Sequence, residues 1–267
     1  MVYVPLRRCG IMNGKREGPK PSKTTMKSTS IAAYELPARV ASYDADMDVM
    51  HPNRHKMVSV ALETFPFDHA STITALDLGT GTGFFTHKFL ERFPQARVIS
   101  VDGSNSMVDL ARTRLGPLAA RVDFRIGDFR QLQDLIPEST HGDAVFSSYA
   151  LHHLNHAEKR EVIRQALRFL KSGGWLINAD IITHESKLIE ERIQRLRVEG
   201  IVRRGHATDP RFRDAASTRQ FLDQLEATDA DQPLTLAEDL QVFQEAGLSH
   251  SAVLWSEYRE IVIGGRK

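Results

Sequence analysis

A glycine-rich segment constrains the fold of this chain more than any other feature. An apolar run over residues 73–78 is followed by Gly79, Gly81 and Gly83, and then by a helical pattern over residues 84–93. Glycine lets backbone pass close to a ligand because no Cβ stands in the way. A helix that begins directly after such a turn presents unpaired N–H groups and the positive end of its dipole. The segment therefore predicts a strand, a turn and a helix that together hold a ligand with an anionic group.

The rest of the chain alternates between short apolar runs and helical patterns. The runs that we expect to form strands lie at residues 73–78, 96–102, 122–126, 142–148, 175–181, 251–256 and 258–263. Alternation of this kind predicts a doubly wound, mostly parallel α/β sheet, in which the last two runs form an antiparallel hairpin. We expect one domain over residues 31–267, with N-terminal helices over 31–65 and a helical insertion over about 185–233.

Two of the expected helices begin with a capping box. Asn155 precedes Glu158 by three residues, and Thr235 precedes Glu238 in the same way. In this motif each side chain accepts a hydrogen bond from the other residue's backbone N–H, so the pattern predicts where each helix begins.

Composition excludes several classes of function. The chain has 267 residues and a net charge of only +1, so bulk electrostatics give no reason to expect nucleic acid as a partner. Cys9 is the single cysteine, which excludes an internal disulfide and a cysteine-based metal site and fits a reducing, cytoplasmic location. No apolar run approaches the roughly 18–20 residues that span a bilayer.

Residues 1–30 form a basic segment in which Glu17 is the only acid. The segment is rich in Gly, Pro, Ser and Thr and has no apolar stretch typical of a secretory signal. We expect a flexible tail, with a transit peptide as the alternative.

The spacing of the glycines indicates the ligand. A dinucleotide fingerprint needs a third glycine where this chain has Phe84. The pattern from Asp77, D-L-G-x-G-x-G, resembles motif I of the class I S-adenosylmethionine (SAM)-dependent methyltransferases, of the small-molecule type with a methyltransferase domain 12 or 25. The resemblance implies that Asp77 meets the ammonium of SAM and that the turn wraps the cofactor. The residues of this turn are Gly79, Thr80, Gly81 and Gly83.

Later segments also resemble motifs of this family. Asp102 ends the second expected strand, where an acid binds ribose hydroxyls in SAM and nicotinamide cofactors alike. The resemblance implies that Met107 packs on the adenine and that Asp128 meets its amino group. The further cofactor residues that it implies are Gly103, Ser104, Phe129 and Ser147.

The acceptor side is less sharply defined. The resemblance implies that the N-terminal helices cover the cofactor pocket, which makes Tyr34 and Tyr43 candidates for substrate contact and catalysis. Tyr149 is expected beside the sulfonium, as a substrate residue. Of the adjacent histidines, we assign His152 a catalytic role and His153 a substrate role, with packing at a helix start as the alternative. We expect no metal, because the spacing to a third ligand is unspecified.

The insertion carries a cluster of arginines, which includes a further candidate substrate residue, Arg197. The cluster is Arg192, Arg195, Arg197, Arg203 and Arg204. Arginines of this kind bind anionic substrates, nucleic acid or acidic lipid. Glutamates alternate with them, however, and the pattern favours a solvated helix with i,i+4 ion pairs.

Together the motifs imply SN2 transfer of the SAM methyl group to a small molecule, which leaves S-adenosylhomocysteine (SAH). The resemblance also implies a strand order of 3-2-1-4-5-7-6. Two alternatives stay open, a non-catalytic SAM- or SAH-binding regulatory protein and a tRNA-base methyltransferase. A nicotinamide-dependent oxidoreductase is disfavoured by Phe84, and the sequence leaves a homodimer open.

Overall fold

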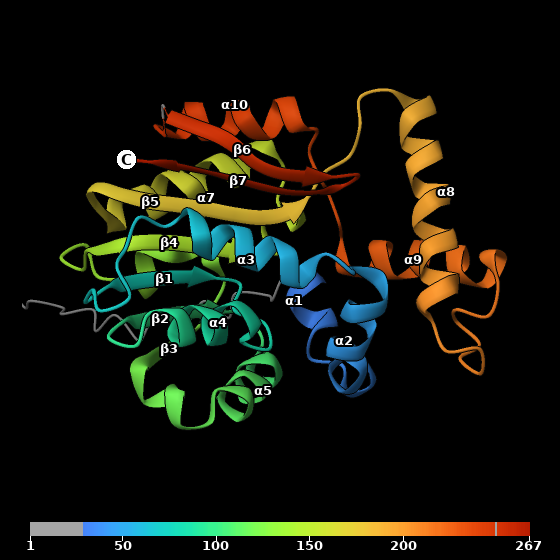
Figure 1. The fold of residues 1–267 in the computed structure, drawn as a ribbon, viewed down its shortest axis with the longest axis horizontal. Coiled ribbons are helices and arrows are strands. Elements are labelled where there is room, and N and C mark those ends of the chain that lie inside the picture. The colour runs from blue at the N-terminus through green and yellow to red at the C-terminus, as the bar shows by residue number, and fades with distance from the viewer. Residues whose placement is uncertain (1–28, 249) are drawn as a thin grey trace, which may run out of the picture.

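The computed structural model describes residues 29–248 and 250–267, and it confirms the strand order expected from the sequence. One seven-stranded sheet runs β3-β2-β1-β4-β5-β7-β6 (Figure 1). Strands β1 to β5 pair in parallel, whereas β7 is antiparallel to both β5 and β6. The strands are β1 Thr74–Leu78, β2 Arg97–Asp102, β3 Val122–Ile126, β4 Gly142–Ser148, β5 Leu170–Ile181, β6 His250–Glu257 and β7 Glu260–Arg266.

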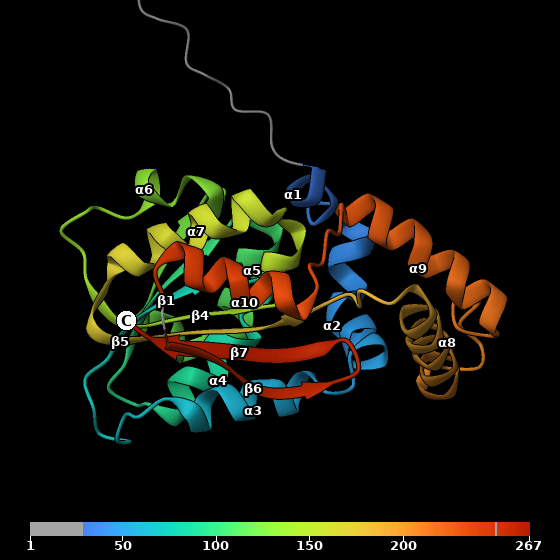
Figure 2. The ribbon, with the colours of Figure 1, turned by 90° about the horizontal axis from the view of Figure 1, so that it is seen from above.

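Helices cover both faces of the sheet. Helices α3 and α4 lie on one face, and α6, α7 and α10 lie on the other (Figure 2). The helices are α1 Thr29–Ala33, α2 Pro37–Met50, α3 Arg54–Thr64, α4 Phe84–Arg92, α5 Asn105–Leu115, α6 Leu132–Leu135, α7 His156–Phe169, α8 Lys187–Arg204, α9 Ala215–Asp229 and α10 Leu236–Ala246. Within the described residues, none of these helices is long and apolar enough to cross a membrane.

The alternation of side chains along each strand divides the core into two layers. In β1, Ala75 packs into the cluster formed with α3 and α4, whereas Leu76 and Leu78 pack into the cluster formed with α7 and α10. Successive residues of a strand point to opposite faces, so a strand covered on both faces is apolar almost throughout. This is why the inner strand β1 could be recognised as a largely apolar run, whereas the edge strand β3 alternates between apolar and charged residues.

A third group of helices lies at one end of the sheet. Helices α1 and α2 and the insertion helices α8 and α9 lie at the end of the sheet toward which the parallel strands run (Figure 1). Residues of α2, α8 and α9 share a smaller apolar cluster there, centred on Met50, Ile201 and Leu222. Open α/β sheets bind ligands at the carboxyl ends of their strands, so these helices lie over the expected site.

Two expected boundaries differ from the structure. Strand β5 begins at Leu170 instead of Trp175, because Leu170 pairs with Gly142 and the amide of Gly173 donates to the carbonyl of Lys267 at 2.9 Å. The tail expected over residues 1–30 overlaps α1, which begins at Thr29, and residues 1–28 lie outside the described part of the chain.

One ion pair in the interface of α7 and α10 is completely buried. The ammonium of Lys159 donates to Asp239 at 2.7 Å, and both side chains are 0% exposed. Arg160 is its exposed neighbour, with 48% of its side chain accessible, and it pairs with Glu245 at 3.2 Å. The two pairs join the same two helices and differ mainly in burial.

We expect Lys159→Met to lower the free energy of unfolding by about 3–5 kcal/mol, because it leaves Asp239 buried without its partner. Arg160→Met should cost at most about 1 kcal/mol, because water screens the exposed pair. Urea unfolding followed by circular dichroism measures both. Equal losses in the two variants would contradict the role given to the buried pair.

Candidate functional site

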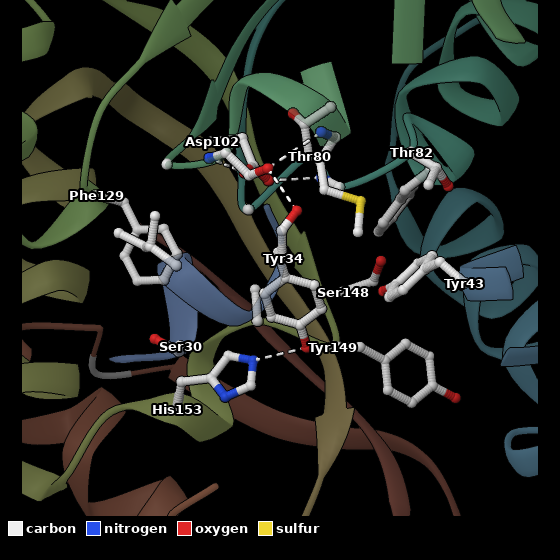
Figure 3. A pocket seen from close by; sticks show the side chains of 18 of the residues that line it. Ser30, Tyr34, Tyr43, Thr80, Thr82, Asp102, Phe129, Ser148, Tyr149 and His153 are labelled. Carbon is white, nitrogen blue, oxygen red and sulfur yellow. Dashed lines mark hydrogen bonds between the residues drawn. The ribbon is translucent and has the colours of Figure 1, made fainter. Parts of the chain in front are cut away.

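A cavity of about 850 Å³ opens where the glycine turn meets the N-terminal helices. Its wall brings together side chains from elements far apart in the sequence (Figure 3). The expected site residues that line it are Tyr34, Tyr43, Gly79, Thr80, Gly81, Asp102, Gly103, Ser104, Met107, Asp128, Phe129, Tyr149 and His153. Five other expected residues do not line it, namely Asp77, Gly83, Ser147, His152 and Arg197.

The glycine turn has the backbone that only glycine adopts readily. Gly79 has φ +75°, and a Cβ there would lie 2.4 Å from the Cβ of Ala150. Gly81 has φ +53°, and a Cβ there would meet nothing nearer than the Tyr43 hydroxyl at 4.0 Å. The turn is thus packed from behind at Gly79 and open to the cavity at Gly81.

The carboxylate of Asp102 joins two turns of the site. One oxygen accepts from the amide of Gly81 at 2.7 Å, and the other accepts from the amide of Ser104 at 2.9 Å. Burial raises the pKa of Asp102, and these backbone hydrogen bonds oppose that shift. Asp102 therefore positions the glycine turn in addition to facing the cavity.

The turn after β2 holds the N-terminal helices in place. Ser104 Oγ caps α5 by accepting from Met107 N at 3.2 Å, and it donates to the carbonyl of Tyr34 at 2.8 Å. Glu35 accepts from the amide of Asn105 at 2.9 Å, at the positive end of the α5 dipole. A Cβ on Gly103 would lie 2.5 Å from the side chain of Ile31. Gly103 and Ser104 thus seat the cover of the cavity.

Asp128 and Arg130 form a pair that sequence reasoning missed. The guanidinium of Arg130 donates to both carboxylate oxygens of Asp128 at 2.7–3.0 Å, and both residues line the cavity. Asp128 also caps the short 3-10 helix Phe129–Gln131. An Asp that follows a strand is often a turn residue. Asp128 is such a turn residue and is also an expected site residue.

Asp77 lies beneath the glycine turn and does not line the cavity, so its expected contact with the ammonium of SAM stays a prediction. Its carboxylate accepts from the hydroxyl of Thr86 at 2.5 Å, inside the layer covered by α4. Burial raises the pKa of Asp77 to about 7, and the hydrogen bond from Thr86 opposes the rise. Gly83 likewise faces the protein, since a Cβ there would lie 2.9 Å from Ala111 of α5.

Ser147 points away from the cavity, and its neighbour Ser148 lines it instead. Ser147 Oγ donates to the carbonyl of Leu78 at 2.7 Å, within the sheet. Side chains alternate along a strand, so the assignment was shifted by one residue.

Tyr149 has an unusual backbone that directs its ring into the cavity wall. Its φ is +48°, a left-handed conformation that residues other than glycine rarely adopt. The hydroxyl donates to Glu260 at 2.6 Å, and the ring lies 4.6 Å from that of His51. Burial and the charge of Glu260 raise the pKa of Tyr149 well above its ordinary value, so the phenol stays neutral.

The two adjacent histidines differ in environment and charge. His152 is buried behind the cavity, with Nδ1 2.7 Å from Asp180 and Nε2 3.4 Å from Asp231. Burial lowers its pKa, but the two carboxylates outweigh this effect and raise the pKa to about 10. His153 lines the cavity, and burial together with the charge of His152 lowers its pKa. The catalytic role assigned to His152 therefore does not fit its position or its charge.

Asp231 links the two histidines and could not be found from the sequence. Its carboxylate lies 3.0 Å from Nδ1 of His153, and the charge of His152 helps to hold the pKa of Asp231 far below its usual range. The ligand atoms of these three residues lie within 4.8 Å of one another. A doubly protonated His152 has no lone pair for a metal ion, so the group is better described as an ion-paired network.

Tyr34 fastens the cover of the cavity to the insertion. Its hydroxyl donates to Asp229 of α9 at 3.2 Å and lies 3.5 Å from Nε2 of His153 (Figure 3). Arg39 donates to the same carboxylate at 2.9 Å and lies over the rings of Tyr34 and Tyr43. No local pattern marks Asp229, the last residue of α9, or Asp231, which lies in the polar linker after this helix.

The sequence profile of the methyltransferase domain family matches residues 75–174, which contain the glycine turn, Asp102 and Asp128. This chain carries a class I methyltransferase domain. An uncharacterized methyltransferase from Geobacillus thermodenitrificans is 36% identical over 125 residues, which are 47% of this chain and 54% of that relative. A malonyl-[acyl-carrier protein] O-methyltransferase from Bacillus cereus is 26% identical over 171 residues, which are 64% of this chain and 60% of that protein. The matches thus span little more than half of these relatives.

Solved structures support the methyltransferase fold. An O-methyltransferase family protein from Burkholderia thailandensis is 24% identical with a TM-score of 0.61, over 88% of this chain and 63% of that one. The complex of DhpI with SAH is 20% identical with a TM-score of 0.57, over 88% of this methyltransferase chain and 94% of that chain. At these identities the likeness shows the fold alone.

The cavity of this methyltransferase domain fits the cofactor that its family implies. Gly81 offers open backbone, Asp102 and Asp128 offer carboxylates, and Met107 and Phe129 offer buried apolar surface for a flat ring. These are the groups that a ligand with a ribose, an adenine and an amino acid requires.

The charge on His152 leads to a prediction about stability. Its pKa of about 10 in the folded protein exceeds the ordinary value of 6.5, so its stabilising contribution is complete below pH 6.5 and is lost as pH rises through 10. The difference in free energy of unfolding between the native protein and His152→Gln should therefore shrink from about pH 7 to pH 10. Urea titrations at several pH values measure it, and a difference that grows with pH would contradict the charged state.

Proposed function

We propose that this chain is an enzyme that binds SAM and transfers its methyl group to a small-molecule acceptor. One observation carries the proposal: a single cavity is lined by the glycine turn, by the carboxylates of Asp102 and Asp128, and by Tyr149 and His153 on the opposite side. When bound, SAM supplies a methyl group on a sulfonium, which is already an excellent leaving group. The printed names of the relatives, an O-methyltransferase among them, support an oxygen acceptor.

The chain's own residues would bind and orient the cofactor. Asp102 retains carboxylate lone pairs for ribose hydroxyls beside the two backbone amides that it already accepts. Asp128 and Phe129 would meet the adenine amino group and ring. Tyr34 and Tyr43 cover the cavity and would keep water out, so that alignment of the two reactants does most of the catalytic work.

Within this proposal, His153 is the general base. Its lowered pKa keeps the ring neutral near pH 7, and the Asp231 carboxylate 3.0 Å from Nδ1 favours the tautomer protonated there, which leaves Nε2 able to accept a proton. Tyr43 and Tyr149 are unsuited to this role, because burial raises the pKa of both phenols. We expect these two tyrosines to position the acceptor.

Calorimetric titration tests the cofactor. We expect SAH to bind and NAD not to bind, since Phe84 replaces the third dinucleotide glycine. Asp102→Ala should weaken SAH binding by about 1–3 kcal/mol, because it removes hydrogen bonds to the ribose. Asp123→Ala removes the same charge from the exposed side of β3 and should leave the affinity unchanged. Tighter binding of NAD than of SAH would refute the proposal, and binding without turnover in an acceptor screen would support a regulatory protein instead.

The pH profile of methyl transfer tests His153. With an acceptor identified by a metabolite screen, activity should fall as pH drops through the pKa of His153, which lies below 6.5, because the base form is lost. His153→Asn should reduce kcat by about 10²–10⁴-fold while SAH affinity stays unchanged. His156→Asn, at the exposed start of α7, is the matched control. An unaltered kcat in His153→Asn would exclude the base role.

A further inference from the structure

A second cavity of about 760 Å³ lies beside the first, at the same end of the sheet. It is enclosed by the turn between α2 and α3, by one face of α8 and by the turn that joins β6 to β7. Neither the methyltransferase motifs nor the cofactor residues account for it, since the two cavities have no lining residue in common.

Contacts of Tyr149 link the walls of the two cavities. Tyr149 lines the first cavity, and its hydroxyl donates to Glu260, which lines the second. The ring of His51 also lines the second cavity, lies against Tyr149 and approaches Glu260 with Nδ1 at 3.2 Å. A molecule in the second cavity would therefore face the cofactor cavity across one hydrogen-bonded tyrosine.

Positive charge exceeds negative charge in this second cavity. Its lining arginines are Arg197, Arg203, Arg204 and Arg259, and its lining carboxylates are Glu257 and Glu260. Glu260 already accepts from Tyr149, and His51 and Asn53 are also hydrogen-bond partners of its carboxylate. The excess of arginine over carboxylate favours an anionic ligand in this cavity.

The arginines are only partly neutralised by the protein. Arg197 and Arg259 share one carboxylate, Glu226, which lies 3.7 Å from Arg259 and in direct contact with Arg197. Burial and the nearby charge of Arg197 lower the pKa of Arg259 to about 10. Within the described chain, no hydrogen bond or ion pair is formed by the side chain of Arg203. The i,i+4 ion pairs that the sequence favoured for this helix are replaced by contacts with other elements.

Much of the remaining wall of the second cavity is apolar, with His51 and Asn53 as its polar members. Met50, Ile181, Ile193 and Leu196 line it together with the ring of Tyr258. Arginine guanidinium groups bind carboxylates through paired hydrogen bonds, and apolar walls bind hydrocarbon. The combination suits a molecule with an acidic group at one end and an apolar body.

We propose that the second cavity binds a small carboxylic acid with an apolar body, whose carboxylate meets Arg203 and Arg259. This site is distinct from the cavity in which methyl transfer is proposed, and its occupation does not depend on the proposed function. The binding of an acid in this cavity can be tested by itself.

The test uses the full chain, with and without saturating SAH, and benzoate as the probe. Calorimetry or ligand-observed NMR should detect binding of benzoate and not of benzamide, which has the same shape without the charge. Phenyl phosphate should bind more weakly than benzoate. Equal binding of benzoate and benzamide would overturn the proposal, and tighter binding of phenyl phosphate would overturn the assignment of a carboxylate.

Variants of the lining arginines test whether benzoate binds in the second cavity. Arg203→Gln, on the exposed end of α8, should weaken benzoate binding about tenfold, because a charged hydrogen bond is lost. Arg259→Lys should also weaken benzoate binding, because lysine keeps the charge but cannot form the paired hydrogen bonds of a guanidinium. Arg195→Gln changes the same charge on another face of α8 and should have no effect. Equal affinity in Arg203→Gln and Arg195→Gln would overturn the site. SAH binding in each variant is read separately, so its absence would count against the proposed function and not against the second cavity.

Discussion

The carboxylate of Asp102 is the contact on which the geometry of the site depends. It accepts from Gly81 in the first βα turn and from Ser104 in the second, so it ties the two loops together. Ser104 in turn holds the carbonyl of Tyr34, which seats the N-terminal helices over the cavity. The positive φ of Gly79 and Gly81 is what lets their loop come this close. One buried acid therefore positions the turn, the cover and the space between them.

The two adjacent histidines differ in charge, because the nearby carboxylates lie mainly around His152. Asp180 and Asp231 keep His152 protonated, and the resulting cation lowers the pKa of His153. The neutral ring is the one that faces the cavity, while the charged ring is buried among its counterions. A buried cation between two carboxylates is costly to separate, which makes the arrangement rigid. Such rigidity is consistent with the proposed role of His153 as a base, since its Nε2 would have to lie at a fixed place.

Two cavities with different lining residues lie at the end of the sheet. Where β4 ends, the left-handed backbone of Tyr149 places its ring between a cavity with carboxylates and a cavity with arginines. We propose a sulfonium cofactor for the first and a small carboxylic acid for the second. Because Glu260 starts β7 and pairs with Ile181 at the end of β5, the antiparallel strand brings its acid to the edge where the parallel strands end. The final hairpin thus contributes to the site as well as to the sheet.

The sequence by itself determined the order of elements, the glycine turn and the capping boxes at Asn155 and Thr235, because each is set by residues within a few positions of one another. It also selected most residues of the cofactor cavity, since these lie at the ends of recognisable strands. Only the tertiary structure decided which of two neighbours faces the cavity, because a displacement of one residue turns a side chain to the other face. It also decided the charge of His152, which depends on Asp231, a residue of a distant linker that no local pattern marks. Local periodicity specifies helices and strands. The protonation state and the hydrogen-bond partners of a side chain depend instead on which distant groups the fold brings within a few ångströms.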